Sequence, residues 1–194
     1  MEAILAELRR RPIAKNEYRD NSGPGRSQCF GVVNKRGMPP DHSRQNWLRP
    51  YLFKLLLDYG AEHVRDISWN AIQVNMNYAA APHRDKGNIG PSYLIAFGDF
   101  TGGELQIHEG DLSGCHNVRH QPLVTDFSKV LHSVLPFEGE RISLVYHYNK
   151  RTPPGLPSMS VEMVDGRWEF KRGGEVCRGL PHPLKGRKHP SPSV

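Results

Sequence analysis

The stretch Ala71-Ile-Gln-Val-Asn-Met-Asn-Tyr78 decides the fold, because apolar and polar side chains alternate along it. A period of two is typical of a β-strand that packs one face into a core. Further short strands are expected between Gly, Pro and Asp turns, over Tyr93–Gly98, Glu104–His108, Leu123–Phe127, Val130–Leu135 and Arg141–Tyr148. The pattern predicts a mainly β protein, built as a barrel or as two packed sheets with helical support.

Helices are expected before this strand-rich region, over Met1–Arg11 and over Trp47–Tyr59, with Gly60 ending the second helix. Residues 20–46 are rich in Gly, Pro, Asn and Ser, so they are expected to be mostly loop, with one strand over Cys29–Val33. Downstream, Ser160–Phe170 predicts a hairpin around Asp165-Gly166.

We expect a single domain and a monomer, because 194 residues are enough for one substantial core. Three parts follow from the pattern: an N-terminal helical and loop support (1–70), a β core (71–150) and a basic, Pro/Gly-rich C-terminal extension (151–194). The last stretch, 179–194, has four prolines and is expected to be extended or disordered.

The composition indicates whether a membrane partner is expected and in which kind of compartment the protein resides. The chain is 37% hydrophobic and 24% charged, with no apolar run of about 18 residues and no secretory signal pattern, so no membrane partner is expected. The three cysteines are odd in number and widely spaced, which indicates a reducing, intracellular compartment rather than a disulfide framework.

The charge is unevenly distributed along the chain. Lys+Arg minus Asp+Glu gives 10 − 5 = +5 for residues 1–50, 8 − 11 = −3 for 51–150 and 8 − 4 = +4 for 151–194. Basic flanks around a slightly acidic centre fit a polyanion held at the rim of a site that contains a cation, or they are simply solvated surface.

A metal site is predicted from three side chains. His83 and Asp85 are two residues apart, so on a strand both can point at one ion, and His132 follows 47 residues later (132 − 85). Two histidines and one carboxylate are the ligand set of non-haem Fe(II) oxygenases, although Zn²⁺ accepts the same ligands. Alternatively, His132 is a core histidine among valines and His120 takes its place.

An anion site is predicted on the last core strand, where Arg141 and Ser143 share one face. A buried arginine needs an anionic partner, because an unpaired charge in a core is costly. A 2-oxoglutarate carboxylate can accept two parallel bonds from Arg141 and a third from the Ser143 hydroxyl. The alternative is a surface salt bridge from Arg141 to Glu138 or Glu140.

Segment 75–150, about 76 residues, resembles the core of a known family. Its matching stretches are His83-Arg84-Asp85-Lys86-Gly87-Asn88, Gly102-Gly103-Glu104-Leu105, Leu131-His132-Ser133-Val134 and Arg141-Ile142-Ser143-Leu144-Val145. They are similar to the double-stranded β-helix (jelly-roll) of the TET/JBP group of Fe(II)/2-oxoglutarate dioxygenases. That family oxidises the methyl group of 5-methylcytosine or thymine in nucleic acid.

The resemblance implies a role for each matching residue. His83, Asp85 and His132 would bind Fe(II), and the iron would in turn bind O₂. Arg141 and Ser143 would bind 2-oxoglutarate. Asn88 and Asn149 would contact the pyrimidine, although Asn149 stands where animal TET enzymes have a histidine. A related algal branch uses ascorbate instead of 2-oxoglutarate.

The resemblance also implies a partner and a compartment. The partner would be nucleic acid, DNA before RNA, and the protein would be nuclear if its substrate is chromosomal DNA. The cysteine-rich zinc module of animal TET proteins is absent from these 194 residues.

Two other functions remain open from the sequence. One is an Fe(II)/2-oxoglutarate hydroxylase of a protein side chain or a small molecule, which would share the ligand set. The other is a non-catalytic nucleic-acid-binding module. Trp168 and Tyr148 are candidates for stacking on bases, or they are ordinary core or rim aromatics.

Overall fold

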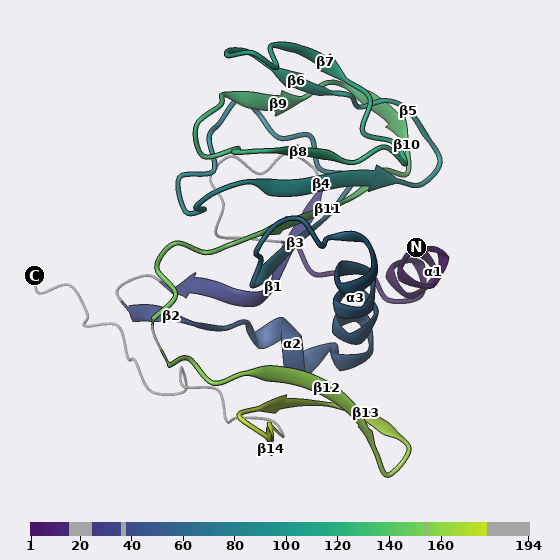
Figure 1. The fold of residues 1–194 in the computed structure, drawn as a ribbon. Helices are drawn as coiled ribbons and strands as arrows, with labels where there is room; N and C mark the ends of the chain where they lie inside the picture. Colours follow the sequence, from purple (N-terminus) through teal and green to yellow (C-terminus); the bar gives the residue numbers. More distant parts are fainter. Residues whose placement is uncertain (16–24, 36–37, 154, 178–194) are drawn as a thin grey trace, which may run out of the picture.

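The computed structural model describes residues 1–15, 25–35, 38–153 and 155–177. No helix in these residues is long and apolar enough to cross a membrane. Three helices precede most of the strands: α1 (Glu2–Arg10), α2 (Arg44–Leu48) and α3 (Pro50–His63). The fold is strand-dominated, and Figure 1 shows its sheets stacked above and below the central strands β1, β3 and β11.

The largest sheet, called here the major sheet, has six strands in the order β2-β1-β3-β11-β4-β8. Their bounds are β1 (Arg26–Lys35), β2 (Met38–His42), β3 (Ala71–Met76), β4 (Ser92–Phe97), β8 (Leu123–Thr125) and β11 (Ile142–His147). All pairs in it are antiparallel, and β11 lies between β3 and β4. Strands far apart in sequence therefore lie side by side at its centre.

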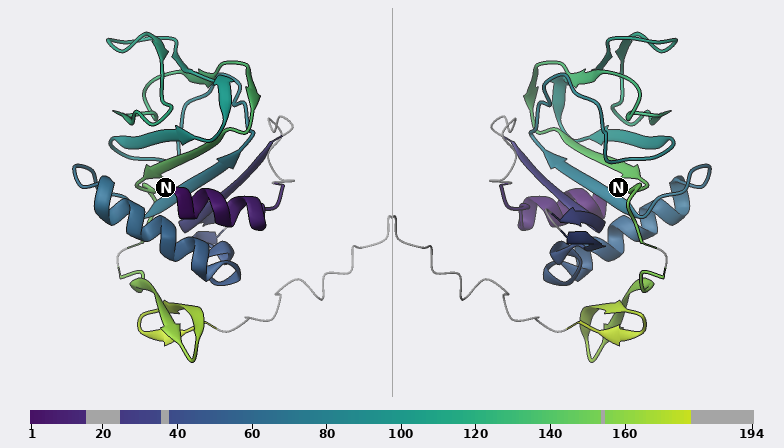
Figure 2. Two further views of the ribbon diagram at one scale, coloured as in Figure 1. Left: turned by 90° about the vertical axis from the view of Figure 1, so that its right-hand side faces the viewer. Right: turned by 90° about the vertical axis from the view of Figure 1, so that its left-hand side faces the viewer.

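A smaller layer faces the major sheet. The minor sheet has the order β7-β6-β9, with β6 (Leu105–Ile107), β7 (Gly114–His116) and β9 (His132–Val134). Beside it, β5 (Phe100–Gly102) pairs with β10 (Phe137–Gly139). These facing antiparallel sheets make the predicted jelly-roll core, and Figure 2 shows helices α1 and α3 against the other side of the major sheet.

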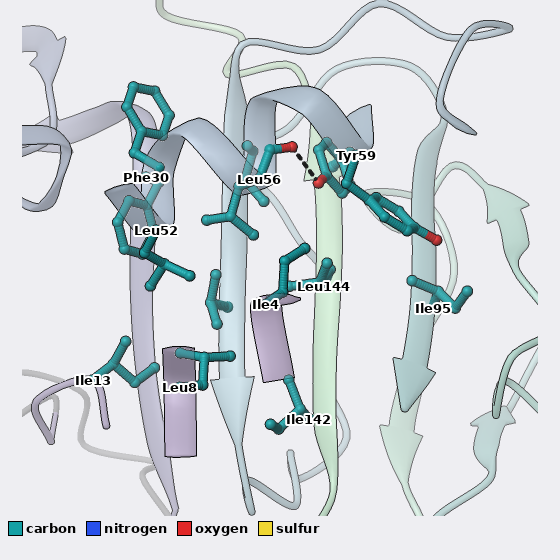
Figure 3. Close-up of a cluster of buried hydrophobic side chains, with 14 of the residues drawn as sticks. Ile4, Leu8, Ile13, Phe30, Leu52, Leu56, Tyr59, Ile95, Ile142 and Leu144 are labelled. Carbon is teal, nitrogen blue, oxygen red and sulfur yellow. Dashed lines mark hydrogen bonds between the residues drawn. The ribbon is translucent and has the colours of Figure 1, made fainter. Parts of the chain in front are cut away.

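Strand parity divides the core between these layers. On β11, Ile142, Leu144 and Tyr146 pack with the helices, whereas Val145 packs between the sheets. On β4, Ile95 faces the helices. Figure 3 shows the helix side, where Leu8 and Leu56 lie over the strands and the hydroxyl of Tyr146 donates to the Leu56 carbonyl oxygen (2.7 Å). The other face of β11 is therefore left to line an interior cavity.

The C-terminal region forms a sheet of its own. β12 (Met159–Val164), β13 (Arg167–Arg172) and β14 (Glu175–Val176) pair in that order, which confirms the hairpin at Asp165-Gly166. Phe170 is buried against Phe53 (ring centroids 5.9 Å apart) and ties this sheet to α3. Residues 179–194, for which an extended tail is expected, lie outside the described residues.

Four details differ from the sequence prediction. Gly60 does not end the helix, because α3 continues to His63. Residues 38–42 form strand β2 rather than loop, and 114–116 form strand β7, which the sequence pattern did not indicate. Strand β1 also extends well beyond the expected Cys29–Val33.

Candidate metal and co-substrate site

The structure brings His83, Asp85 and His132 together. One ligand atom from each side chain lies within 4.8 Å of the others, and His83 Nε2 is 3.5 Å from Asp85 Oδ1. His83 and His132 form an isolated antiparallel bridge, in which each backbone N–H donates to the other's carbonyl oxygen (2.9 and 3.0 Å). The Asp85 N–H is fixed in turn by the Phe127 carbonyl (2.9 Å). Backbone bonds thus hold all three side chains at one point.

Both imidazoles are oriented for coordination through Nε2. His83 Nδ1 lies 2.8 Å from the Ala81 carbonyl oxygen, and His132 Nδ1 lies 3.1 Å from that of Val130. A carbonyl accepts only from a protonated nitrogen, so neutral rings carry their proton on Nδ1 and present the Nε2 lone pair. Such a second bond is the usual support of a metal-binding histidine.

The electrostatics of the three side chains suit a cation. Burial raises the pKa of Asp85, but the adjacent His83 side chain and the nearby imidazoles of His132 and His147 outweigh it and lower that pKa overall. Burial and the neighbouring His83 lower the pKa of His132, against the bond to Val130. A carboxylate is thereby kept ionised beside a neutral histidine, which is the protonation state that ligation requires.

An inner cavity of about 110 Å³ runs from these ligands toward Arg141. Its lining includes His83, Asp85 and His132, and also Arg141 and Ser143 from β11. The Arg141 side chain is only 2% exposed, and its guanidinium lies over the rings of Phe100 (5.6 Å) and Phe137 (5.7 Å). Burial lowers its pKa to about 10, which Glu104 partly opposes.

The guanidinium of Arg141 is not fully paired. Its Nε donates to the Gly103 carbonyl oxygen (3.0 Å), but its buried Nη2 has no hydrogen-bond partner among the residues that the structure describes. No salt bridge joins Arg141 to a carboxylate within the described residues, and Glu140 pairs with Arg9 instead. A buried cation with an unmet donor beside a cavity fits an anionic ligand, as 2-oxoglutarate would be.

Two residues that sequence reasoning missed hold Arg141 in place. Asn77, at φ 51°, accepts the Arg141 N–H on Oδ1 (2.8 Å) and donates its own N–H to the Arg141 carbonyl (2.7 Å). Gly103 lies so near that a Cβ there would be 2.9 Å from Arg141 Cδ and Nε. The Gly-Gly bend expected from sequence is therefore also the space into which the arginine packs.

Ser143 lies at the end of a hydrogen-bonded row of polar side chains from three strands. Gln73 Nε2 donates to Ser27 Oγ (2.8 Å), Ser27 donates to Asn75 Oδ1 (2.7 Å), and Asn75 Nδ2 donates to Ser143 Oγ (3.1 Å). The Ser143 oxygen already accepts, so its proton is left to donate to a cavity ligand. The sequence signal for this hydrogen-bonded row was the alternation of the polar residues Gln73 and Asn75 with apolar residues in β3.

An outer cavity of about 550 Å³ opens beside the same ligands. His83 and Asp85 line both cavities, as do Asn88 and His147. Asn88 Nδ2 lies 3.4 Å from Asp85 Oδ2, within reach of a metal ligand as well as of a substrate. Asn149 is 3% exposed, lines the outer cavity, and accepts the Arg151 N–H on Oδ1 (3.2 Å).

Other candidates lie elsewhere. His120 lines a different cavity, beside Tyr93 and Val124, and not the one that contains His132. Trp168 stacks on Tyr51 (6.0 Å between centroids) and lines neither the inner nor the outer cavity. Tyr148 is 36% exposed next to Asn149.

Comparisons with known proteins identify the fold. No protein-family model matches the chain, and no curated protein matches it. A solved structure of NgTET1 in complex with 5mC DNA aligns with a TM-score of 0.52 and 17% identity, over 79% of this chain and 70% of that chain. At this identity the likeness establishes the fold alone.

Two further solved structures align less well. A 2OG-Fe(II) oxygenase family protein from Burkholderia pseudomallei has a TM-score of 0.49 and 19% identity, over 78% of this chain and 81% of that chain. A Pseudomonas putida prolyl-4-hydroxylase has 0.46 and 18%, over 77% and 85%. The jelly-roll fold and the His-Asp-His site together fit an Fe(II)- and 2-oxoglutarate-dependent dioxygenase, with Fe(II), 2-oxoglutarate and O₂ as cofactor and co-substrates.

Proposed function

We propose that this protein is a dioxygenase that oxidises a methyl group on a pyrimidine base in nucleic acid, with 5-methylcytosine as the first expectation. The observation that carries the co-substrate assignment is the unpaired Nη2 of buried Arg141, in the same cavity as the three metal ligands. A dicarboxylate would bind the metal at one end and Arg141 with Ser143 at the other. Bound Fe(II) would supply oxidation of a C–H bond by O₂, coupled to decarboxylation of 2-oxoglutarate.

The two cavities suggest a division of labour. The inner one is small and holds the arginine, so it suits the co-substrate, whereas the outer one has the size of an ordinary ligand pocket. His83 and Asp85 line both, so a methyl group in the outer cavity would lie beside the metal. Positioning one C–H bond there is the main task of the protein.

Two amide side chains in the outer cavity favour a nucleic-acid base as its occupant. Asn88 and Asn149 both line it, and an amide can bond a pyrimidine edge as donor and acceptor. A base within a duplex cannot reach such a site, so it must be extruded or belong to a single strand. DNA is proposed before RNA, and the protein would be nuclear if that DNA is chromosomal.

Mass spectrometry of modified oligonucleotides tests this function. The protein is incubated in air with Fe(II), 2-oxoglutarate and matched DNA or RNA strands that contain 5-methylcytosine, cytosine or thymine. We expect oxidised 5-methylcytosine in step with succinate, and neither product from His132→Ala. Succinate that forms equally with all strands, or with peptide mixtures only, would instead indicate a protein side-chain or small-molecule hydroxylase. Turnover sustained by ascorbate without 2-oxoglutarate would overturn the role of Arg141.

A further inference from the structure

The outer cavity has a lip made of two paired segments. Asn88 and Asn149 form an isolated antiparallel bridge, flanked by bonds from the Ile89 N–H to the Tyr148 carbonyl (3.0 Å) and from the Lys150 N–H to the Gly87 carbonyl (3.1 Å). Residues 86–89 and 148–151 thus run side by side, and we call them the lip; Lys86, Gly87, Asn88 and Asn149 among them line the outer cavity. Most of its exposed side chains are basic or apolar.

The lip carries positive charge that no salt bridge between described residues neutralises. Lys86, Lys150 and Arg151 are exposed, and none forms a salt bridge within the described residues. The neighbouring Arg84 differs, because it pairs with Glu109. Segments 81–92 and 147–153 contain one acidic residue, the metal ligand Asp85. Three exposed cations on two adjacent segments beside the cavity would attract an anionic polymer.

The apolar side chains of the lip distinguish one polyanion from another. Ile89 is 58% exposed and Tyr148 is 36% exposed, and their backbones are joined across the lip. An acidic peptide offers carboxylates, but a flat apolar partner only where it happens to carry an aromatic side chain. A nucleic-acid strand offers phosphates and base faces together, and exposed aromatic rings between cations are the usual platform for it.

We propose that the lip is the surface on which a nucleic-acid strand lies, with Lys86, Lys150 and Arg151 on its phosphates and Tyr148 and Ile89 against a base that flanks the target. The inference rests on the proposed function, since it names the contacts by which a strand reaches that site. It also assigns phosphate binding to the lip rather than to the basic N- and C-terminal flanks. The target base would pass the lip to enter the outer cavity between Asn88 and Asn149.

Binding can be measured without any reaction. A fluorescein-labelled single strand with one 5-methylcytosine is titrated anaerobically with the full chain at several salt concentrations, and affinity is read from anisotropy. Each phosphate contact contributes about 0.7 to the slope of log affinity against log salt. The variant Lys86→Ser/Lys150→Ser/Arg151→Ser should therefore flatten this slope by about 2. Arg167→Ser, an exposed arginine on the β12–β13 hairpin that lines neither cavity, is the matched control and should leave the slope unchanged.

Stacking has a separate readout. Tyr148→Ser should weaken strand binding by about fivefold or more with an unchanged salt slope, because a stacked ring carries no charge. Met163→Ser, which removes an apolar side chain of similar exposure (52%) on the hairpin, should not. Thermal unfolding of each variant identifies any loss that comes from misfolding.

The outcomes separate this proposal from the proposed function. A slope that persists in the triple variant overturns the lip, even if unaltered protein oxidises 5-methylcytosine. A slope that flattens supports the lip, even if mass spectrometry finds no oxidised base. Equal competition by polyglutamate and by the oligonucleotide would also overturn it, because the surface would then bind acidic chains in general.

Discussion

Replacing Gly103 with alanine tests whether Arg141 holds the co-substrate. Gly103 has φ +72°, and an added Cβ would lie 2.9 Å from Cδ and Nε of Arg141 and 3.0 Å from the Cβ of Phe137. Arg141 is buried (2% exposed), so we expect the arginine to relieve the contact by moving its guanidinium. That movement would break the alignment of Nε with the Gly103 carbonyl and displace Nη2 in the cavity.

The size of the effect follows from two contributions. An alanine at positive φ costs about 1–2 kcal/mol, and overpacking of the arginine adds about 1–3 kcal/mol of lost stability. A displaced guanidinium should lose about one charge-assisted hydrogen bond to the ligand, worth about 1.5–3 kcal/mol. The dissociation constant for 2-oxoglutarate should therefore rise by roughly 10- to 150-fold.

Gly166→Ala is the matched control for this substitution. Gly166 has φ +75°, and nothing lies within 4 Å of its added Cβ, so it carries the backbone strain without the contact. Calorimetry of 2-oxoglutarate binding to Fe(II)-loaded, anaerobic protein should show weakened binding in Gly103→Ala. Gly166→Ala should bind 2-oxoglutarate as tightly as the unaltered protein does. Equal affinity in both variants would refute the assignment of Arg141 as the anchor.

Three further predictions concern the site. His83→Ala or Asp85→Ala should abolish Fe(II) binding in an anaerobic titration, while the midpoint of thermal unfolding changes little. His120→Ala should bind Fe(II) normally. Full Fe(II) affinity in Asp85→Ala would contradict the ligand set. Arg141→Ala should raise the KM for 2-oxoglutarate by roughly 30-fold or more, since about 2–5 kcal/mol is lost with a charge-assisted pair, and an unchanged KM would point to another co-substrate. Asn88→Ala should reduce oxidation of methylated oligonucleotide while succinate formation without substrate persists; if Fe(II) affinity falls as well, Asn88 serves to position Asp85.

Much of the site followed from strand parity. The alternation in Ala71–Met76 predicted that one face of the strand would pack into a core, and Ile72 and Val74 of that face are buried in the cluster that contains the helix residues. The same parity placed Arg141 and Ser143 on one face of the last core strand, and both line the inner cavity together with Val145 and His147 of that strand. A period of two is a local property of the chain, so it can be read without knowledge of the partner strands.

Features that depend on distant partners could not be read in this way. Gly60 looks like a helix stop, but an added Cβ there would lie 2.5 Å from the Trp69 ring and 2.8 Å from that of Tyr146. It is therefore a point of close packing inside α3. The prolines of residues 38–42 suggested loop, yet β2 is an edge strand, where a missing N–H need not break the sheet.

The contacts around Arg141 show why a sequence pattern can mark a site without explaining it. The Gly-Gly of residues 102–103 indicated a bend, and both glycines do have φ +72°. Only the fold reveals that the second lies against a side chain 38 residues later in the sequence, and that Asn77 binds the same arginine from another strand end. Each of these contacts joins segments that no local period connects. Arg141 is confined and has one donor without a partner among the described residues, so an anion bound in the cavity should raise the free energy of unfolding of the protein. Binding of 2-oxoglutarate should then stabilise the whole jelly roll, because it satisfies a group that the fold itself leaves unpaired.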